Sequence, residues 1–273
     1  TLLERAVSVL GDDMVCLLDT QYRMHHDIMR WSSDLLYDGR LAAADAVKAH
    51  LLADLPHVDE DENTGAPLVF VDTAGCGFEE STSEQEDASI SNEGEAKIIE
   101  HHVRQLLDAG LRQEEIGIIT PYNGQVELLS SMLAAELPGV EVRSIDGFQG
   151  RENEAILISL VRSNGRRIVG FLSECRRLNV AVTRAKRHLF VVGDSDTVGS
   201  DKRLATLMTY LGDVADVRSG FEFMASVDGN VSMRARPSKP KRTGPKPPET
   251  ELERRQRFAA LFAGMLADPA FES

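Results

Sequence analysis

The sequence has little cysteine, and the spacing of the few it has excludes two common roles. Three cysteines occur in 273 residues, Cys16, Cys76 and Cys175, and none belongs to a CxxC pair. An odd, widely spaced set supports neither a disulfide framework nor a zinc site, so we expect no bound metal from these residues. The expected environment is reducing and intracellular, in the cytoplasm or the nucleus.

Long apolar runs are also absent. No run approaches the ~20 residues of a membrane helix, and the amino terminus lacks the basic-then-apolar pattern of a secretion signal. We therefore expect a soluble globular protein without a membrane partner. With 42% hydrophobic and 27% charged residues, the chain can bury the core of one large domain with appendages. Because residue 1 is Thr, the natural start is expected upstream.

Two further absences concern nucleotides and nucleic acids. The pattern Gly-x-x-x-x-Gly-Lys-Ser/Thr occurs nowhere, so the chain lacks the backbone cradle and lysine that hold the β- and γ-phosphates of a nucleotide. The formal net charge is -14. Such a charge argues against binding nucleic acid by bulk electrostatics, and any nucleic-acid contact must be local.

The hydrophobic pattern alternates between short apolar runs and amphipathic stretches. It predicts strands at 14–18, 67–72, 116–120, 140–143, 155–161, 188–193 and 221–223. It predicts helices at 1–10, 28–36, 46–55, 92–110, 126–137, 176–187 and 204–211. Alternation of this kind indicates an α/β fold with a parallel sheet covered by helices on both faces.

The predicted helix 176–187 carries fixed positive charge. Arg177 and Arg184 are seven residues apart, on the face opposite the apolar residues Leu178 and Val182. A guanidinium is planar, always charged and donates in a fork, which suits a phosphate. The alternative is a solvated cationic helix end that favours the helix dipole.

Other polar groups follow predicted strands. Gln21-Tyr22-Arg23 offers an aromatic ring for stacking and a cation for phosphate. Gly147 and Gly150 allow a close backbone approach, and Glu152 offers an acceptor for a sugar hydroxyl. Because ligands of parallel sheets bind beyond the carboxyl ends of the strands, we expect 21–23, 120–123 and the surroundings of Arg184 to converge there. Each segment alone could also be an ordinary turn.

Several charged or titratable clusters have simpler interpretations. The acidic run 59–62 is expected to be a loop, since Pro56 precedes it and no buried strand leads into it. The adjacent pairs His25-His26 and His101-His102 are expected at the surface, because neighbours on a helix point about 100° apart and cannot easily share a metal. The acidic run 79–87 contains no basic residue and is expected to be a solvated, mobile loop.

The composition changes after residue 228. Residues 229–248 hold five of the ten prolines and six basic residues without an acid, which predicts a disordered basic linker. Residues 249–273 have a capping box and one apolar stripe, which predict an amphipathic helix of unknown role. The expected organisation is therefore a folded domain 1–228, this basic arm and a terminal helix.

Three longer strings together resemble one family. Gln21-Tyr22-Arg23-Met24-His25 resembles motif IV, Ser144 to Glu152 motif V, and Arg177 to Ala185 motif VI of superfamily 1 helicases of the nonsense-mediated-decay type. Asp72-Thr73-Ala74-Gly75-Cys76-Gly77 and Arg162-Ser163-Asn164 also match the family's pattern, and the resemblance covers residues 12 to 224.

The resemblance implies that the chain is the second, C-terminal RecA-like lobe of a P-loop helicase. The first lobe would carry the P-loop and the ligands of Mg²⁺, and the two lobes would use ATP to move 5′ to 3′ along single-stranded RNA or DNA. By the same resemblance, Arg184 and Arg23 would be catalytic contacts of the γ-phosphate and Tyr22 would stack on adenine. Gln21, Gly150 and Glu152 would line the nucleotide cleft. The implied nucleic-acid contacts are Thr120, Pro121, Tyr122, Asn123, Ser144 and Arg162.

A rival interpretation is a non-catalytic module that binds nucleic acid or a protein partner and kept a helicase-like fold. The missing P-loop favours this rival, whereas Arg23, Glu152 and Arg184 together favour the motor. A helicase fused to a nuclease is a third alternative. The discriminating observation would be a GxxxxGK[ST] string in the upstream coding sequence.

Overall fold

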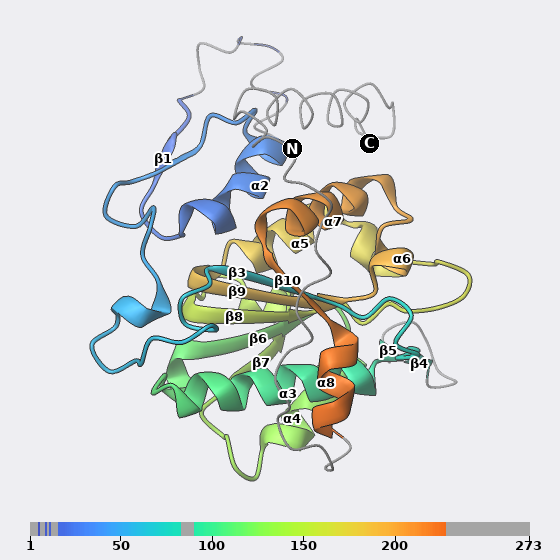
Figure 1. Cartoon of the computed structure of the whole chain (residues 1–273). Coiled ribbons are helices and arrows are strands. Elements are labelled where there is room, and N and C mark those ends of the chain that lie inside the picture. Colours follow the sequence, from blue (N-terminus) through green and yellow to red (C-terminus); the bar gives the residue numbers. More distant parts are fainter. Residues whose placement is uncertain (1–4, 6–8, 10, 12–15, 83–89, 228–273) are drawn as a thin grey trace, which may run out of the picture.

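The computed structural model describes residues 5, 9, 11, 16–82 and 90–227. Its centre is a six-stranded sheet in the order β10-β3-β9-β8-β6-β7, and every neighbouring pair is parallel (Figure 1). The strands are β3 (Leu68–Asp72), β6 (Ile116–Thr120), β7 (Glu141–Ser144), β8 (Asn153–Ser159), β9 (Ala185–Gly193) and β10 (Asp216–Ser219). The predicted α/β class, a RecA-like parallel sheet between helices, is confirmed.

Successive strand residues face opposite sides of the sheet and build two separate cores. Ile156 and Ile158 of β8 face one core, whereas Leu157 faces the other. The first core is covered by α2 (His26–Leu36), α5 (Cys175–Val182), α6 (Ser195–Val198) and α7 (Lys202–Val214). The second is covered by α3 (Glu93–Asp108), α4 (Asn123–Leu133) and α8 (Gly220–Val227). A sheet buried on both faces explains why the strands read as continuous apolar runs.

Short elements complete the described chain. β1 (Thr20–Gln21) pairs in parallel with β2 (Ala42–Ala43), and β4 (Ser81–Thr82) pairs in antiparallel with β5 (Ile90–Ser91). Single 3₁₀ turns lie at η2 (Leu52–Asp54), η4 (Gln113–Glu115), η5 (Asp146–Phe148) and η6 (Gly170–Ser173). In the described part of the chain, no helix is long and apolar enough to cross a membrane.

Several predicted elements are wrong or end elsewhere. Residues 16–18 form no strand, residues 46–55 form turns and the short η2, and the predicted strand 221–223 belongs to the helix α8. The helix predicted at 126–137 spans 123–133. Short apolar runs fit a strand and a helix equally well, so pairing partners decide these cases. The predicted helix 1–10, the arm 229–248 and the helix 249–273 lie outside the described residues, apart from residues 5 and 9.

The buried histidines correct another prediction. His102 is fully buried on α3 rather than exposed, and its Nε2 lies 3.0 Å from Nε2 of His188 on β9. Nδ1 of His188 lies 2.7 Å from the carbonyl oxygen of Ala66. Burial lowers the pKa of His188 to about 4 and that of His102 well below its usual value. A long-range partner on β9 therefore satisfies a polar group that the helix pattern alone assigns to solvent.

Candidate functional site

The candidate residues fall into two groups at opposite ends of the sheet. Thr120 ends β6, and Ser144 ends β7, whereas Arg184 directly precedes β9 and Glu152 directly precedes β8. The strands are parallel, and the seven residues of β8 span about 20 Å. The predicted convergence of 120–123 with Arg184 at the carboxyl ends is therefore wrong, because helix α5 returns the chain to the amino ends before β9 begins.

Three side chains meet at the amino ends of β8 and β9, and we call Arg23, Glu152 and Arg184 the arginine cluster. Nε of Arg23 lies 2.5 Å from Oε2 of Glu152, with 35% and 39% of the two side chains exposed. Nη1 of Arg23 donates to the carbonyl oxygen of Thr183 at 3.0 Å. Two segments more than a hundred residues apart are thus joined beside Arg184.

The turn 21–25 is held by the side chain of Gln21. Its Oε1 accepts from the amides of Arg23 at 2.8 Å and Met24 at 2.7 Å, and its Nε2 donates to the carbonyl oxygen of Met24 at 2.8 Å. The amide of His25 donates to the carbonyl oxygen of Lys186 on β9 at 2.9 Å. Tyr22 lies on the outside of this turn with 74% of its surface exposed. The turn presents Tyr22 and Arg23 while Gln21 is occupied internally.

The helix predicted at 176–187 is α5, and it ends at Val182. Arg184 therefore lies just beyond the end of this helix. Its Nε donates to the carbonyl oxygen of Val180 at 2.9 Å and its Nη1 to that of Arg151 at 3.3 Å. Burial, followed by the nearby charge of Arg23, lowers the pKa of Arg184, and Glu152 opposes that shift. Neutral carbonyl oxygens therefore orient the guanidinium of Arg184. The nearby carboxylate of Glu152 interacts with both Arg23 and Arg184.

The loop before β8 leaves room beside the arginine cluster. Gly150 has φ of +84°, and a Cβ built there would meet nothing within 4 Å. Oε1 of Glu152 also lies 3.7 Å from Nζ of Lys186. No group of three or more metal-ligating side chains occurs among the residues that the structure describes. The open surface beside two arginines suits an anion better than a metal ion.

At the carboxyl ends, the candidate nucleic-acid contacts divide by burial. Thr120 is fully buried, Tyr122 is 1% exposed and Arg162 is 5% exposed, whereas Pro121, Asn123 and Ser144 reach the surface. The hydroxyl of Tyr122 donates to the carbonyl oxygen of Val169 at 3.0 Å and accepts from Nη1 of Arg162 at 3.4 Å. Tyr122 and Arg162 therefore support their surroundings from inside.

Two acids behind this surface make contacts that the local sequence does not predict. Oε2 of Glu80 lies 3.0 Å from Nε of Arg162 and accepts from the amide of Ser163 at 2.9 Å, so Glu80 does not belong to a solvated loop. Glu95, which the capping-box pattern assigns to the start of α3, turns inward. Its Oε2 accepts from the hydroxyl of Ser159 at 2.6 Å and from the amide of Val161 at 2.8 Å. No local pattern predicts either contact, because both partners lie more than sixty residues away.

Glu95 and Val161 are each in an energetically unfavourable setting, Val161 through its backbone conformation and Glu95 through burial of its carboxyl group. Val161 has φ of +71°, a left-handed conformation that is rare for a β-branched residue, and the hydrogen bond from its amide holds it there. Glu95 is fully buried, and burial raises the pKa of its carboxyl to about 8. The carboxyl is therefore mostly protonated at neutral pH.

Comparison with known proteins gives several similarities. The family described as "AAA domain" matches residues 1–196. The chain is 46% identical to "DNA-binding protein SMUBP-2" of Mesocricetus auratus over 227 residues, 83% of this chain and 23% of that protein. It is 49% identical to "DNA polymerase alpha-associated DNA helicase A" of Schizosaccharomyces pombe over 202 residues, 72% of this chain and 31% of that protein.

A third relative is "Regulator of nonsense transcripts 1 homolog" of Drosophila melanogaster. The identity is 34% over 204 residues, which are 72% of this chain and 17% of that protein. The chain therefore spans less than a third of the length of each of these relatives.

Proposed function

Because the chain belongs to the AAA domain family and, within it, to the superfamily 1 helicases related to SMUBP-2, we propose that it is the C-terminal motor lobe of an ATP-dependent helicase. The family resemblance of the three motif strings is thus confirmed. The motor itself is a proposal for a longer protein, whose first RecA-like lobe would hold the P-loop and the ligands of Mg²⁺.

The observation that carries this proposal is the arginine cluster. In this cluster Arg23 and Arg184 both interact with the carboxylate of Glu152, and burial, followed by the charge of Arg23, lowers the pKa of Arg184. Like charges held together destabilise the fold unless an anion joins them. A γ-phosphate presented by the first lobe is such an anion, and it gains charge on its equatorial oxygens during transfer.

In this proposal each side chain at this end of the sheet has a role. Arg184, held by the carbonyl oxygens of Val180 and Arg151, and Arg23, held by Thr183 and Glu152, approach the γ-phosphate when the lobes close. The exposed ring of Tyr22 stacks on adenine, and Glu152 with the open surface at Gly150 lines the cleft. Hydrolysis then depends on closure, which couples it to movement of the lobes.

In this proposal single-stranded RNA or DNA binds at the carboxyl ends of the β-strands. Pro121, Asn123 and Ser144 are at the surface and contact the backbone directly, whereas Thr120, Tyr122 and Arg162 support that surface from inside. Separate sites at the two ends allow the lobe to hold nucleotide and nucleic acid at once. Alternating grip by the two lobes would then move the strand, in the 5′-to-3′ direction that the family resemblance implies.

The alternative is a binding module without catalysis. Its support is the absence of a P-loop anywhere in these 273 residues. A pure scaffold, however, has no need of two arginines beside one carboxylate with an open surface in front of them. The arginine cluster favours the motor for this reason.

ATP hydrolysis by this chain with and without its first lobe tests the proposal. The 273-residue chain alone should not hydrolyse ATP measurably, because the β-phosphate cradle is absent. The protein that includes the upstream lobe should show hydrolysis stimulated by single strands. Stimulated turnover by the chain alone, or none by the two-lobed protein, would contradict the motor.

The basic arm, residues 229–248, should add non-specific affinity for nucleic acid. Replacing its six basic residues with Gln should reduce the slope of log affinity against log salt, by about 0.7 for each lost phosphate contact on a single strand. Fluorescence anisotropy with a labelled oligonucleotide at several salt concentrations measures the slope. An unchanged slope would show that the arm only links two segments.

A further inference from the structure

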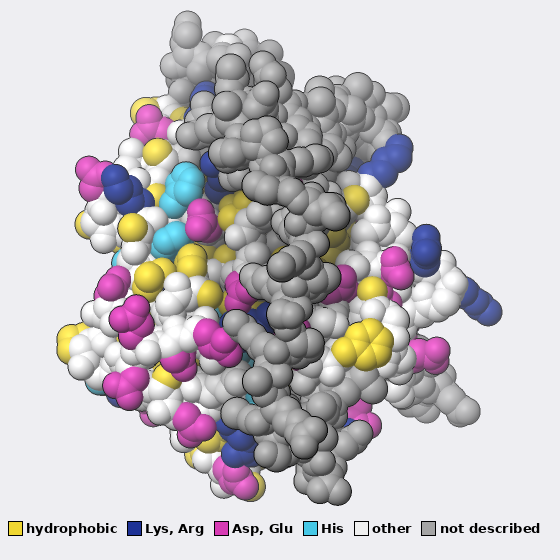
Figure 2. Space-filling model, viewed as in Figure 1, with side chains coloured by type: hydrophobic (Ala, Val, Ile, Leu, Met, Phe, Trp, Pro, Cys, Tyr) yellow, Lys and Arg dark blue, Asp and Glu magenta, His cyan; other side chains and the backbone are white. Residues whose placement is uncertain are grey.

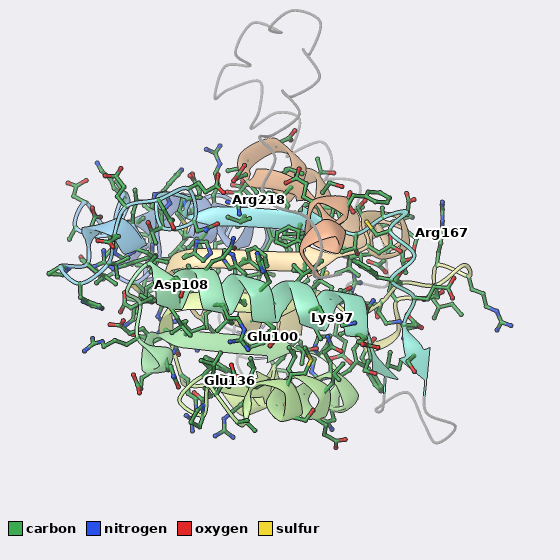
Figure 3. All side chains as sticks on the ribbon, turned by 60° about the horizontal axis from the view of Figure 1, so that its bottom comes forward. Lys97, Glu100, Asp108, Glu136, Arg167 and Arg218 are labelled. Atoms are coloured by element: carbon green, nitrogen blue, oxygen red, sulfur yellow. The ribbon has the colours of Figure 1, made fainter. Side chains whose placement is uncertain are left out.

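The segment from 165 to 173, between β8 and α5, extends beyond the carboxyl ends of the strands. Figure 1 shows it as a loop standing out from the side of the domain, and in Figure 3 Arg167 points away from the sheet into solvent. We call this segment the 165–173 loop. No motif string of the sequence analysis includes it, and the proposed roles of the lobe leave it unused.

Hydrogen bonds of Asn164 brace the 165–173 loop. Oδ1 of Asn164 accepts from the amide of Ile168 at 3.0 Å, and its Nδ2 donates to the carbonyl oxygen of Ile168 at 2.9 Å and to Glu80 at 3.0 Å. The hydroxyl of Ser200 donates to the carbonyl oxygen of Arg167 at 2.9 Å. These bonds fix the backbone around Arg167, whose φ of +55° is left-handed.

The base of the loop rests on the two buried residues of the carboxyl-end site. Tyr122 donates its hydroxyl hydrogen to the carbonyl oxygen of Val169. A Cβ added at Gly170 would lie 2.8 Å from Nη1 of Arg162 and 3.2 Å from the hydroxyl oxygen of Tyr122. Tyr122 and Arg162 therefore support the loop from below, and Tyr122 lies in the chain between Pro121 and Asn123, which reach the surface.

The charges on the loop differ from most other charges of this acidic domain. Arg166 and Arg167 are adjacent and exposed, and neither has an ion pair with a described residue. Many exposed cations elsewhere in the described chain are paired with carboxylates, among them Arg40, Lys48, Arg104, Arg112, Arg143 and Arg151. Arg176 and Lys202 are also exposed without an ion pair to a described residue, but they are not adjacent to a second such cation. Figure 2 shows basic side chains projecting at the right-hand edge of the domain, with acidic side chains beside some of them.

Apolar surface accompanies these two arginines. Ile168 and Phe171 are each 50% exposed, although the chain has few exposed large hydrophobic residues among those described. A hydrogen-bonded loop that presents two unpaired guanidiniums and an aromatic ring matches a single-stranded nucleic acid, because its phosphates bind cations and its unstacked bases stack on a ring face. An acidic protein surface would use the charges but not the ring.

We propose that the 165–173 loop is a further binding element for single-stranded nucleic acid, with Arg166 and Arg167 on phosphates and Phe171 against a base. The inference rests on the proposed function, because it extends the nucleic-acid side of the same lobe. In this proposal the buried Tyr122 and Arg162 position the loop and do not contact the nucleic acid themselves.

The test is binding of the full 273-residue chain, with its arm neutralised, to a fluorescent oligo(dT). Arg166→Ala/Arg167→Ala should lower the slope of log affinity against log salt by about 1.4, from two contacts of about 0.7 each. Phe171→Ala should weaken binding about tenfold at fixed salt without changing the slope. Arg40→Ala/Lys48→Ala removes the same charge at the other end of the domain and should leave the slope unchanged.

A second readout uses Phe171→Trp. The natural tryptophan, Trp31, is 1% exposed, so a new fluorescence quench on adding oligo(dT) would report a base against position 171. No binding by the parent chain, an unchanged slope in the double arginine variant or the absence of a quench would each overturn the proposal. If these fail while the two-lobed protein still shows stimulated ATP hydrolysis, only the loop proposal is wrong and the motor stands.

Discussion

Arg184→Ala in the two-lobed protein should reduce ATP turnover by on the order of 10³-fold, which corresponds to about 4 kcal/mol of transition-state stabilisation. The side chain is oriented by the carbonyl oxygens of Val180 and Arg151, so it is preformed for an incoming anion. Charge on the γ-phosphate grows only as the bond breaks. Nucleotide affinity should therefore change much less than turnover. Steady-state hydrolysis at saturating single strand measures the effect.

Two matched variants separate catalysis from structure. Arg184→Lys should recover only part of the turnover, because an ammonium cannot reproduce the planar fork. Arg177→Ala removes an arginine of the neighbouring helix, whose partners are Asp146 and Glu174 on the surface, and should have little effect. Turnover within a few-fold of the parent, or a loss that only follows a lower thermal midpoint, would make Arg184 structural.

Glu95→Gln should stabilise the folded chain at high pH and not at low pH. The folded pKa is raised to about 8 by burial, from an ordinary value of 4.5. Between these values the unfolded chain binds fewer protons than the folded chain, so the free energy of unfolding falls as pH rises. The loss across this window is at most on the order of 5 kcal/mol. Glutamine keeps an acceptor for Ser159 and Val161 without titrating.

Urea unfolding at pH 5, 7 and 8.5 measures this difference. The advantage of the glutamine variant should be near zero at pH 5 and reach several kcal/mol at pH 8.5. The histidine pair contributes the opposite slope, because its low folded pKa values make stability rise with pH up to about 6.5, but it cancels in the difference. Glu93→Gln, on the exposed face of the same helix, should show no such pH dependence. A constant difference for Glu95→Gln would mean that its carboxyl is charged in the fold.

Much of this fold is predictable from local pattern, because its strands are buried on both faces. The runs at 67–72 and 116–120 match β3 and β6, and Asn92 caps α3 as predicted by accepting from the amide of Glu95. The hydrophobic pattern predicted the wrong element where a short apolar run has no pairing strand. Residues 16–18 and 221–223 are such runs: neither pairs with a strand, and residues 221–223 lie in the helix α8.

The site was predictable in content but not in arrangement. Motif strings name Arg23, Glu152 and Arg184, and these three do lie together. Their place at the amino ends of β8 and β9 was missed, because the length of α5 decides at which end of the sheet Arg184 lies. The inward turn of Glu95 and the ion pair of Glu80 with Arg162 were missed for another reason. Local sequence carries no record of a partner sixty or more residues away.

The measurement that tests the central claim most directly is binding of a transition-state mimic by the two-lobed protein. ADP with aluminium fluoride imitates the transferring phosphoryl group, whereas ADP alone lacks it. If Arg184 meets that group, Arg184→Ala should weaken binding of the mimic by on the order of 10³-fold and leave the affinity for ADP within a few-fold of the parent. Equal effects on both ligands, or no effect on either, would contradict the account of this chain as the lobe that supplies arginine to the γ-phosphate.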